Sequence, residues 1–196
     1  MNLGEILENV QNSDFERLGV ISDVEVHGLS YDSRLTTSGD LFFCFQGEKN
    51  DSHDFVYDAI KGGASALVVE REIDIDFPQV ISSNSRKMMS EIAEIFYGFP
   101  SREITTVGVT GTNGKTTTVN ILSAIAEAAG KKPKTIGTLT GQLTTPEAPD
   151  LQRQIRDSVG SGASFLAMEV SSHALLQHRI SGMAYDAAIF TNLSLD

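Results

Sequence analysis

The chain has 196 residues, a formal net charge of −11, 40% hydrophobic and 21% charged residues. These values are ordinary for a folded globular protein of one or two domains, and the excess of acidic groups argues against a nucleic-acid partner. No apolar run approaches the roughly 20 residues of a membrane span, and the N-terminus lacks the features of a signal peptide, so we expect a cytoplasmic protein without membrane insertion.

The first half of the chain alternates between helix-like and strand-like patterns. Leu3, Ile6, Leu7 and Val10 are spaced along one face of a short helix. We expect strands at residues 24–29, 40–45, 66–69 and 79–82, and helices at 53–61 and 85–97. Cys44 is the single cysteine, which excludes an intrachain disulfide, and its apolar neighbours favour a buried structural thiol.

Residues 98–102 read Gly-Phe-Pro-Ser-Arg and interrupt the last of these helices. We predict an exposed hinge there, between a first domain at residues 1–98 and a second at 103–196. In the second half we expect strands at 104–107, 135–138, 165–170 and 186–190, with helices at 118–129 and 149–159. Strands that alternate with helices predict an α/β fold with a mainly parallel sheet.

The most informative motif is the glycine-rich turn at residues 108–117, Gly-Val-Thr-Gly-Thr-Asn-Gly-Lys-Thr-Thr. It lies between an expected strand and an expected helix, which is the layout of a phosphate-binding loop. In such a loop Lys115 reaches the outer phosphates and the Thr116 hydroxyl is a ligand of Mg²⁺. The common Walker A pattern has glycine where this chain has Val109, so this is a shorter form. A stray Gly-Lys-Thr in a surface loop is the alternative, and the flanking strand and helix argue against it.

Polar residues follow two other expected strands, and in open α/β sheets ligands bind at the carboxyl ends of strands. Glu169 suits a Mg²⁺ ligand that leaves coordination sites for phosphate, although a solvated acid at a strand end is the plainer alternative. His173 either helps to hold a metal or nucleotide or caps the next helix. Thr191 and Asn192 end the last expected strand.

Other basic and imidazole side chains give weaker indications. Arg179 suits a bidentate contact to carboxylate or phosphate, whereas a surface arginine is the commoner outcome. His27 and His53 have no metal-ligand spacing, and we treat them as non-metal residues. The sequence shows no Ser/His/Asp or Cys/His catalytic arrangement.

Four segments together resemble the Mur ligases, ATP-dependent enzymes that add amino acids to the peptidoglycan precursor. The segments are residues 31–34 with 39–42, 108–117, 143–150, and 168–175 with 177–179. The phosphate loop is shared with folylpolyglutamate synthases. The Thr-Thr-Pro and Ser-Ser-His-Ala-Leu segments are similar to the branch that adds the third residue to UDP-N-acetylmuramoyl-L-Ala-D-Glu.

The resemblance implies a small N-terminal α/β domain that binds the UDP substrate, followed by a P-loop domain with a mainly parallel sheet. It implies that Ser33 contacts the UDP part and that ATP and Mg²⁺ are bound in the second domain. The implied catalytic residues are Lys115 and Glu169, and the implied metal ligands are Thr116 and Glu169. The implied nucleotide residues are Gly111, Thr112, Asn113, Gly114, Lys115, Thr116, Thr117 and Asn192. The implied contacts to the muramoyl-dipeptide end are Thr144, Thr145, Ser171, Gln177 and Arg179.

Two departures from the family pattern concern position 52 and the length of the chain. Ser52 stands where the family usually has glycine before His53. The sequence stops just after Thr191-Asn192-Leu193, so the resemblance implies an N-terminal fragment that lacks the C-terminal domain, is inactive alone and is a monomer. A nucleotide- or UDP-sugar-binding module without ligase turnover, or another Mur or folylpolyglutamate-type ligase, is the alternative.

Overall fold

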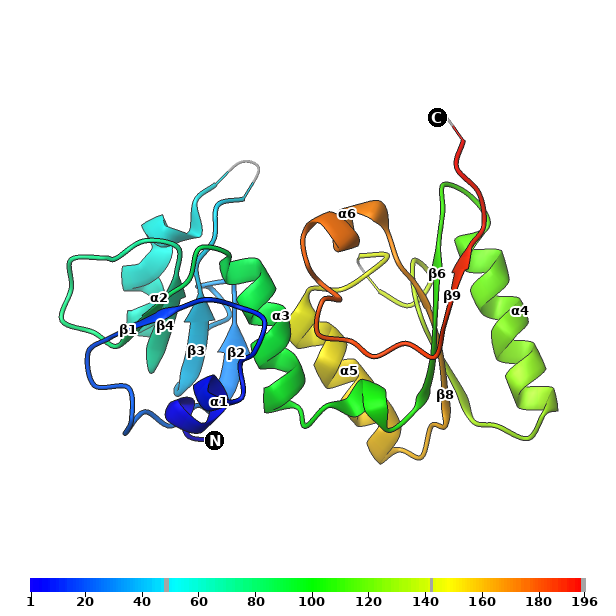
Figure 1. Ribbon diagram of the computed structural model, residues 1–196, viewed down its shortest axis with the longest axis horizontal. Helices are drawn as coiled ribbons and strands as arrows, with labels where there is room; N and C mark the ends of the chain where they lie inside the picture. The colour runs from blue at the N-terminus through cyan, green and yellow to red at the C-terminus, as the bar shows by residue number, and fades with distance from the viewer. Residues whose placement is uncertain (48–49, 142, 195–196) are drawn as a thin grey trace. The chain divides into compact units, whose positions relative to one another are not determined.

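The computed structural model describes residues 1–47, 50–141 and 143–194. The chain forms two compact units, Met1–Phe96 and Tyr97–Asp196, which we call the first and second units. Each unit has its own sheet flanked by helices (Figure 1). The α/β class expected from the sequence is therefore confirmed.

The first unit contains a five-stranded sheet in the order β1-β5-β4-β3-β2. Strands β2 to β5 pair in parallel, and β1 pairs antiparallel with β5. The strands are β1 (Glu16–Leu18), β2 (Gly28–Ser30), β3 (Asp40–Phe43), β4 (Ala66–Val69) and β5 (Gln79–Ile81). The helices are α1 (Leu3–Glu8), the 3₁₀ helix η1 (Ser52–Phe55), α2 (Val56–Gly62) and α3 (Ser85–Phe96).

The core of the first unit explains its continuous apolar runs. Every residue of β3 and β4 is buried. Phe42 and Leu67 pack with Val56 and Ala59 of α2, and α3 contacts β3 as well as α1. A parallel strand covered on both faces has no polar side, which is why these strands read as apolar runs rather than as alternating patterns.

Three expectations for the first unit need correction. The strand expected at 24–29 is confined to Gly28–Ser30, while Glu25 makes only an isolated bridge to Asn2. β1 was missed, because its three residues are exposed on a sheet edge and carry no burial pattern. The segment expected as a helix from residue 53 starts with the 3₁₀ turn η1, in which the Asp51 side chain accepts the His53 N–H.

The second unit contains a four-stranded, fully parallel sheet in the order β7-β8-β6-β9. Its strands are β6 (Thr105–Thr110), β7 (Pro133–Ile136), β8 (Phe165–Glu169) and β9 (Ala187–Phe190). Its helices are the 3₁₀ helix η2 (Pro100–Arg102), α4 (Lys115–Ala128), α5 (Ala148–Gly160) and α6 (Ser172–Leu176).

Alternate side chains of β8 pack on different helices. Leu166 and Met168 belong to the cluster that includes Leu151 of α5, whereas Ala167 packs with Val119 of α4. Helices α4 and α5 therefore cover opposite faces of the sheet (Figure 1). Because all four strands are parallel, their carboxyl ends meet at one edge, and the loops that carry the candidate residues leave from that edge.

The second unit also differs from expectation at three places. The helix expected from residue 118 begins at Lys115, and the strand expected at 135–138 lies at Pro133–Ile136. The segment expected as an exposed hinge, residues 98–102, is exposed only at Gly98 and Arg102. Pro100 and Ser101 are buried, and the Ser101 hydroxyl accepts the Ala184 N–H at 3.0 Å. This segment is thus part of the second unit's packing.

Candidate functional site

The loop between β6 and α4 has the geometry of a phosphate cradle. Gly111 has φ 135° and Gly114 has φ 84°, both in the region that favours glycine. A Cβ at Gly111 would lie 2.2 Å from the Thr191 hydroxyl and 2.8 Å from the Asn192 carbonyl oxygen, so the backbones approach too closely for a side chain. No side chain caps α4, which leaves the amides of its first turn available to an anion.

The end of β9 holds this loop in place. The Thr191 hydroxyl donates to the Asn113 carbonyl at 2.7 Å, and the Asn192 carbonyl accepts the Thr112 N–H at 3.0 Å. The Asn192 amide makes two further bonds to the Asn113 backbone, each 3.1 Å long. Asn192, expected beside the nucleotide, therefore contacts the loop that would bind it.

Lys115 is the first residue of α4 and folds back over the loop. Its Nζ donates to the carbonyl oxygens of Gly111 at 2.6 Å and Thr112 at 3.0 Å. The ammonium group is thereby held above the glycine turn. Thr117, the third residue of α4, is exposed.

Glu169 is the last residue of β8 and is 2% exposed. Its Oε1 accepts the Thr116 hydroxyl at 3.0 Å and the Thr138 N–H at 3.0 Å, while its Oε2 accepts the Thr138 hydroxyl at 3.3 Å. The structure therefore brings together two of the expected residues, Thr116 of α4 and Glu169 of β8. The plainer alternative of a solvated strand-end acid does not hold.

This pair suits a hard divalent cation. Mg²⁺ prefers oxygen ligands and usually takes only one or two from the protein, with water and substrate phosphate supplying the others. A hydroxyl and a carboxylate beside a phosphate loop meet that requirement. In the described part of the chain no group of three or more His, Cys, Asp or Glu side chains could hold a metal ion, so an all-protein cage is not found there.

The Thr-Thr-Pro loop, residues 144–146, lies next to Glu169. The Thr144 hydroxyl is 3.0 Å from that of Thr138. Thr145, 1% exposed, donates through its hydroxyl to the Glu169 carbonyl at 3.0 Å and accepts the Ser171 N–H at 3.1 Å. These contacts join the loop to the end of β8.

Three more expected residues flank α6, Ser171 at its start and Gln177 and Arg179 after its end. The Ser171 hydroxyl caps this helix by accepting the Ala174 N–H at 3.1 Å, so His173, which is exposed, is not the cap. Arg179 donates to the Thr145 carbonyl at 2.8 Å and to the Gln177 side chain at 2.7 Å. Arg179 is thus a loop-holding residue here rather than a surface arginine.

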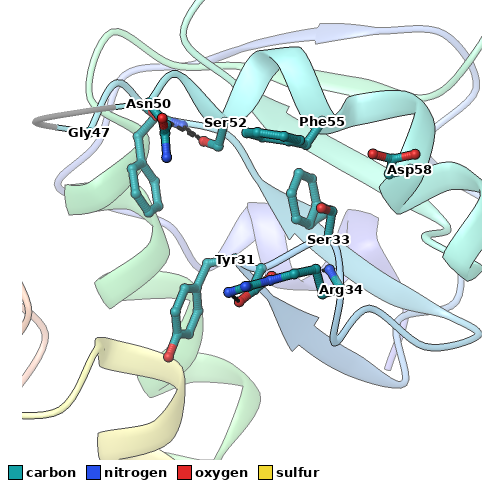
Figure 2. Close-up of a pocket in the computed structure, with 11 residues that line it drawn as sticks. Tyr31, Ser33, Arg34, Gly47, Asn50, Ser52, Phe55 and Asp58 are labelled. Atoms are coloured by element: carbon teal, nitrogen blue, oxygen red, sulfur yellow. Dashed lines mark hydrogen bonds and ion pairs between the residues drawn. The ribbon is translucent and has the colours of Figure 1, made fainter.

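Ser33 lies far from this site in the chain, in a cavity of about 450 Å³ within the first unit. Figure 2 shows Tyr31, Ser33 and Arg34 on one wall and Ser52 and Phe55 on the other. Aromatic rings together with a few polar groups are typical of a pocket for a small molecule.

Two local contacts shape this cavity. Arg34 forms a two-pronged contact to Asp32 at 2.9 and 2.6 Å, and this side-chain hydrogen bonding lowers the pKa of Asp32 although burial acts in the opposite direction. The Ser52 hydroxyl accepts the Phe45 N–H at 2.7 Å and donates to the Phe45 carbonyl at 2.8 Å. A glycine at position 52 would lack both side-chain bonds, so the serine found here fastens the loop.

The structure adds three residues to the site: Gly137 and Thr138, which lie against the Glu169 carboxylate, and Glu147, which pairs with Arg179. The sequence pattern extended a strand through Thr138, and none of the three was a candidate. A Gly-Thr pair directly after a strand in a parallel sheet was the available signal, because such residues stand at the ligand-binding edge.

Two family profiles match the chain in succession. The profile described as "Mur ligase family, catalytic domain" matches residues 25–97, and that described as "Mur ligase middle domain" matches residues 109–196. The chain belongs to the Mur ligase family. Ser33 lies in the first matched region, and the phosphate loop and Glu169 lie in the second.

Curated relatives agree with this membership of the Mur ligases. UDP-N-acetylmuramoyl-L-alanyl-D-glutamate--2,6-diaminopimelate ligase of Geobacillus kaustophilus is 46% identical over 88% of this chain and 37% of its own length. The ligase of the same name from Listeria monocytogenes is 37% identical over 100% of this chain and 41% of its own. The Mur ligase chain described here thus spans about two fifths of the length of these relatives.

Solved structures share the Mur ligase fold. A structure of UDP-N-acetylmuramoyl-L-alanyl-D-glutamate--2,6-diaminopimelate ligase matches all of this chain with a TM-score of 0.81 at 26% identity, over 41% of that chain. MurF ligase of Thermotoga maritima in complex with ADP matches 87% of this chain with a TM-score of 0.63 at 25% identity, over 38% of that chain. In the described part of the Mur ligase chain no helix is both long and apolar enough to cross a bilayer.

Proposed function

We propose that this chain supplies the substrate- and nucleotide-binding parts of an ATP-dependent ligase. The reaction is the addition of the third amino acid to UDP-N-acetylmuramoyl-L-Ala-D-Glu, in the cytoplasm, during peptidoglycan synthesis. The observation that carries the proposal is the edge of the second unit's sheet, where a glycine loop, Lys115 and the Thr116–Glu169 pair lie together. The names of the relatives support the substrate.

Each group of residues has a task in this proposal. The amides of residues 111–117 and the Lys115 ammonium bind the phosphates of ATP, and Asn192 keeps the loop in shape. Thr116 and Glu169 hold Mg²⁺, which neutralises charge on the phosphoryl group when it is bound. Thr144, Thr145, Ser171, Gln177 and Arg179 form the wall that faces the muramoyl-dipeptide end, and Ser33 contacts the UDP part.

The chemistry follows from these positions. ATP transfers its terminal phosphoryl group to the free carboxylate of the substrate, which gives an acyl phosphate and ADP. An incoming amine then attacks the acyl carbon, phosphate leaves, and an amide remains. This chain's contribution is to orient the phosphates and the carboxylate and to offset their negative charge, which an acidic protein of net charge −11 can do only through local donors and cations.

Separate titrations of the two ligands test this proposal. We expect calorimetry to detect binding of Mg-ATP and of UDP-N-acetylmuramoyl-L-Ala-D-Glu to the chain as it stands, with UDP alone competing only against the second ligand. If the chain binds Mg-ATP but does not bind the UDP substrate, the result would support a module that binds only the nucleotide. Binding of neither ligand would contradict the proposal. Because the relatives are named for 2,6-diaminopimelate, that amino acid is the first acceptor to test.

A further inference from the structure

The carboxylate of Glu169 is held from two sides. On one side Thr116 of α4 donates its hydroxyl to Oε1 at 3.0 Å. On the other side Thr138 supplies two donors, its N–H to Oε1 at 3.0 Å and its hydroxyl to Oε2 at 3.3 Å. Two of the three hydrogen bonds to this buried carboxylate thus come from one residue, Thr138, the second residue after β7.

Gly137 provides the space that this arrangement needs. In the β7–β8 pairing Ile136 lies opposite Met168, so Gly137 meets Glu169 at the next step. A Cβ on Gly137 would lie 2.3 Å from Oε1 of Glu169 and 2.7 Å from its carboxyl carbon. The carboxylate therefore lies across a position where any side chain would displace it.

The hydrogen bonds also have a direction. An ionised carboxylate can only accept, so the single hydroxyl proton of Thr138 is used on Oε2 of Glu169. The 3.0 Å contact between the hydroxyls of Thr144 and Thr138 must then be donated by Thr144. A line of donation therefore runs from Thr144 through Thr138 to Glu169, and the oxygen of Thr144 is left as an acceptor.

We propose that Thr138 is a positioning residue, which holds the Glu169 carboxylate toward Thr116 and links it to Thr144 in the Thr-Thr-Pro loop. This inference rests on the proposed function, in which Thr116 and Glu169 hold Mg²⁺ beside the nucleotide. Thr138 does not touch the cation in this proposal. It sets the orientation of a ligand, as partners in the outer shell of metal sites commonly do.

The test compares ATP binding in the presence of Mg²⁺ with ATP binding in EDTA, measured by calorimetry. Thr138→Val removes the hydroxyl, keeps the N–H and nearly keeps the shape. We expect it to weaken Mg-ATP binding by roughly 10- to 100-fold, the usual effect of losing an outer-shell partner, and to leave metal-free ATP binding unchanged. Thr138→Ser should restore the wild-type value.

Two further variants complete the design. Thr105→Val makes the same change at an exposed position at the start of β6, the opposite end of the strand from the phosphate loop, and should bind as wild type does. Gly137→Ala displaces the carboxylate without removing a donor and should reproduce the selective loss of Mg-ATP affinity. If Thr138→Val folds poorly, Gly137→Ala still measures how the position of the Glu169 carboxylate affects Mg-ATP affinity.

The contrary outcomes are separable. Wild-type Mg-ATP affinity in Thr138→Val, or equal losses with and without Mg²⁺, would overturn the positioning role. If wild type binds ATP equally well with Mg²⁺ and in EDTA, the proposed cation site is wrong instead. In that case the unfolding free energies of the ligand-free Thr138→Val, Glu169→Gln and double variants test whether Thr138 and Glu169 interact. If the losses of the two single variants add up to that of the double variant, the interaction is overturned, and if they do not add up, it is supported.

Discussion

Arg179 and Glu147 form an ion pair at 2.9 Å in which only 12% and 10% of the two side chains remain exposed. The same guanidinium donates to the Thr145 carbonyl and to Gln177. Through these contacts the segment after α6 fastens the Thr-Thr-Pro loop, which places Thr144 and Thr145 beside the end of β8. The ion pair therefore both stabilises the fold and holds in place the loop that forms part of the proposed substrate wall.

We expect Arg179→Ala to lower the free energy of unfolding by about 3 kcal/mol, because it breaks an ion pair whose two side chains are mostly buried. Urea denaturation measures this loss. Arg153→Ala is the matched control, since its pair with Asp150 has side chains that are 58% and 32% exposed, and it should change stability by less than about 1 kcal/mol. Equal losses in the two variants would contradict the structural role of Arg179.

Lys115→Ala should weaken Mg-ATP binding by about 1.5–3 kcal/mol, the range for a hydrogen bond to a charged group. It should lower the unfolding free energy by only about 1 kcal/mol, since the lost bonds go to carbonyls of a loop that is only half-buried. Calorimetry and thermal melts check the two halves. Lys131→Ala, at an exposed position just after α4, should change neither quantity. A large loss of stability with unchanged ATP affinity would make Lys115 a purely structural residue.

Ser33→Ala should weaken binding of the UDP substrate by about 1 kcal/mol, the usual net value of one hydrogen bond, and leave Mg-ATP binding unchanged. The reason is that Ser33 lines a cavity of the first unit, whereas the phosphate loop belongs to the second. Titration calorimetry with each ligand measures both effects. Ser22→Ala, at an exposed position that does not line this cavity, is the control. Identical affinities in Ser33→Ala and wild type would remove Ser33 from the site.

Asp51 should make stability depend on pH at the acidic end. Burial raises the pKa of its carboxyl, but hydrogen bonds from the backbone and ring of His53 and from Arg71 outweigh this and lower the pKa to about 2 from 3.8. A lowered pKa in the folded state stabilises the protein above the unfolded value, and the contribution is lost as pH falls through the folded value.

We therefore expect the stability difference between wild type and Asp51→Asn to shrink by about 2 kcal/mol as pH falls from about 5 toward 2. Urea denaturation of both proteins at several pH values measures it. A difference that does not change on acidification would show that these contacts do not lower the pKa of Asp51.

Local features of the sequence were enough to predict several elements. The buried run Ala66–Val69 and the helix around residues 85–96 were placed closely, because continuous apolar runs and a regular apolar stripe are local signals. The glycine turn before Lys115 was also predicted from a local signal, because the residue types that bind phosphate lie within ten consecutive positions, 108–117.

Other features were decided by neighbours in space. Residues 98–102 read as a hinge because Gly and Pro break helices, yet Ser101 is buried against Ala184, 83 positions away. The edge strand β1 has no apolar pattern of its own, and its pairing with β5 brings Leu18 to Gln79. Such contacts have no local signature.

The sequence by itself determined the phosphate loop, the strand and helix that flank it, and the acid at the end of β8. Only the tertiary structure decided what that acid contacts. Thr116 is 53 positions from Glu169 and Thr138 is 31 positions away, and the three meet because parallel strands end at one edge of the sheet. Whether a buried carboxylate faces solvent, a cation site or a neighbouring hydroxyl depends on which donors that packing brings within about 3 Å, and spacing along the chain does not encode it.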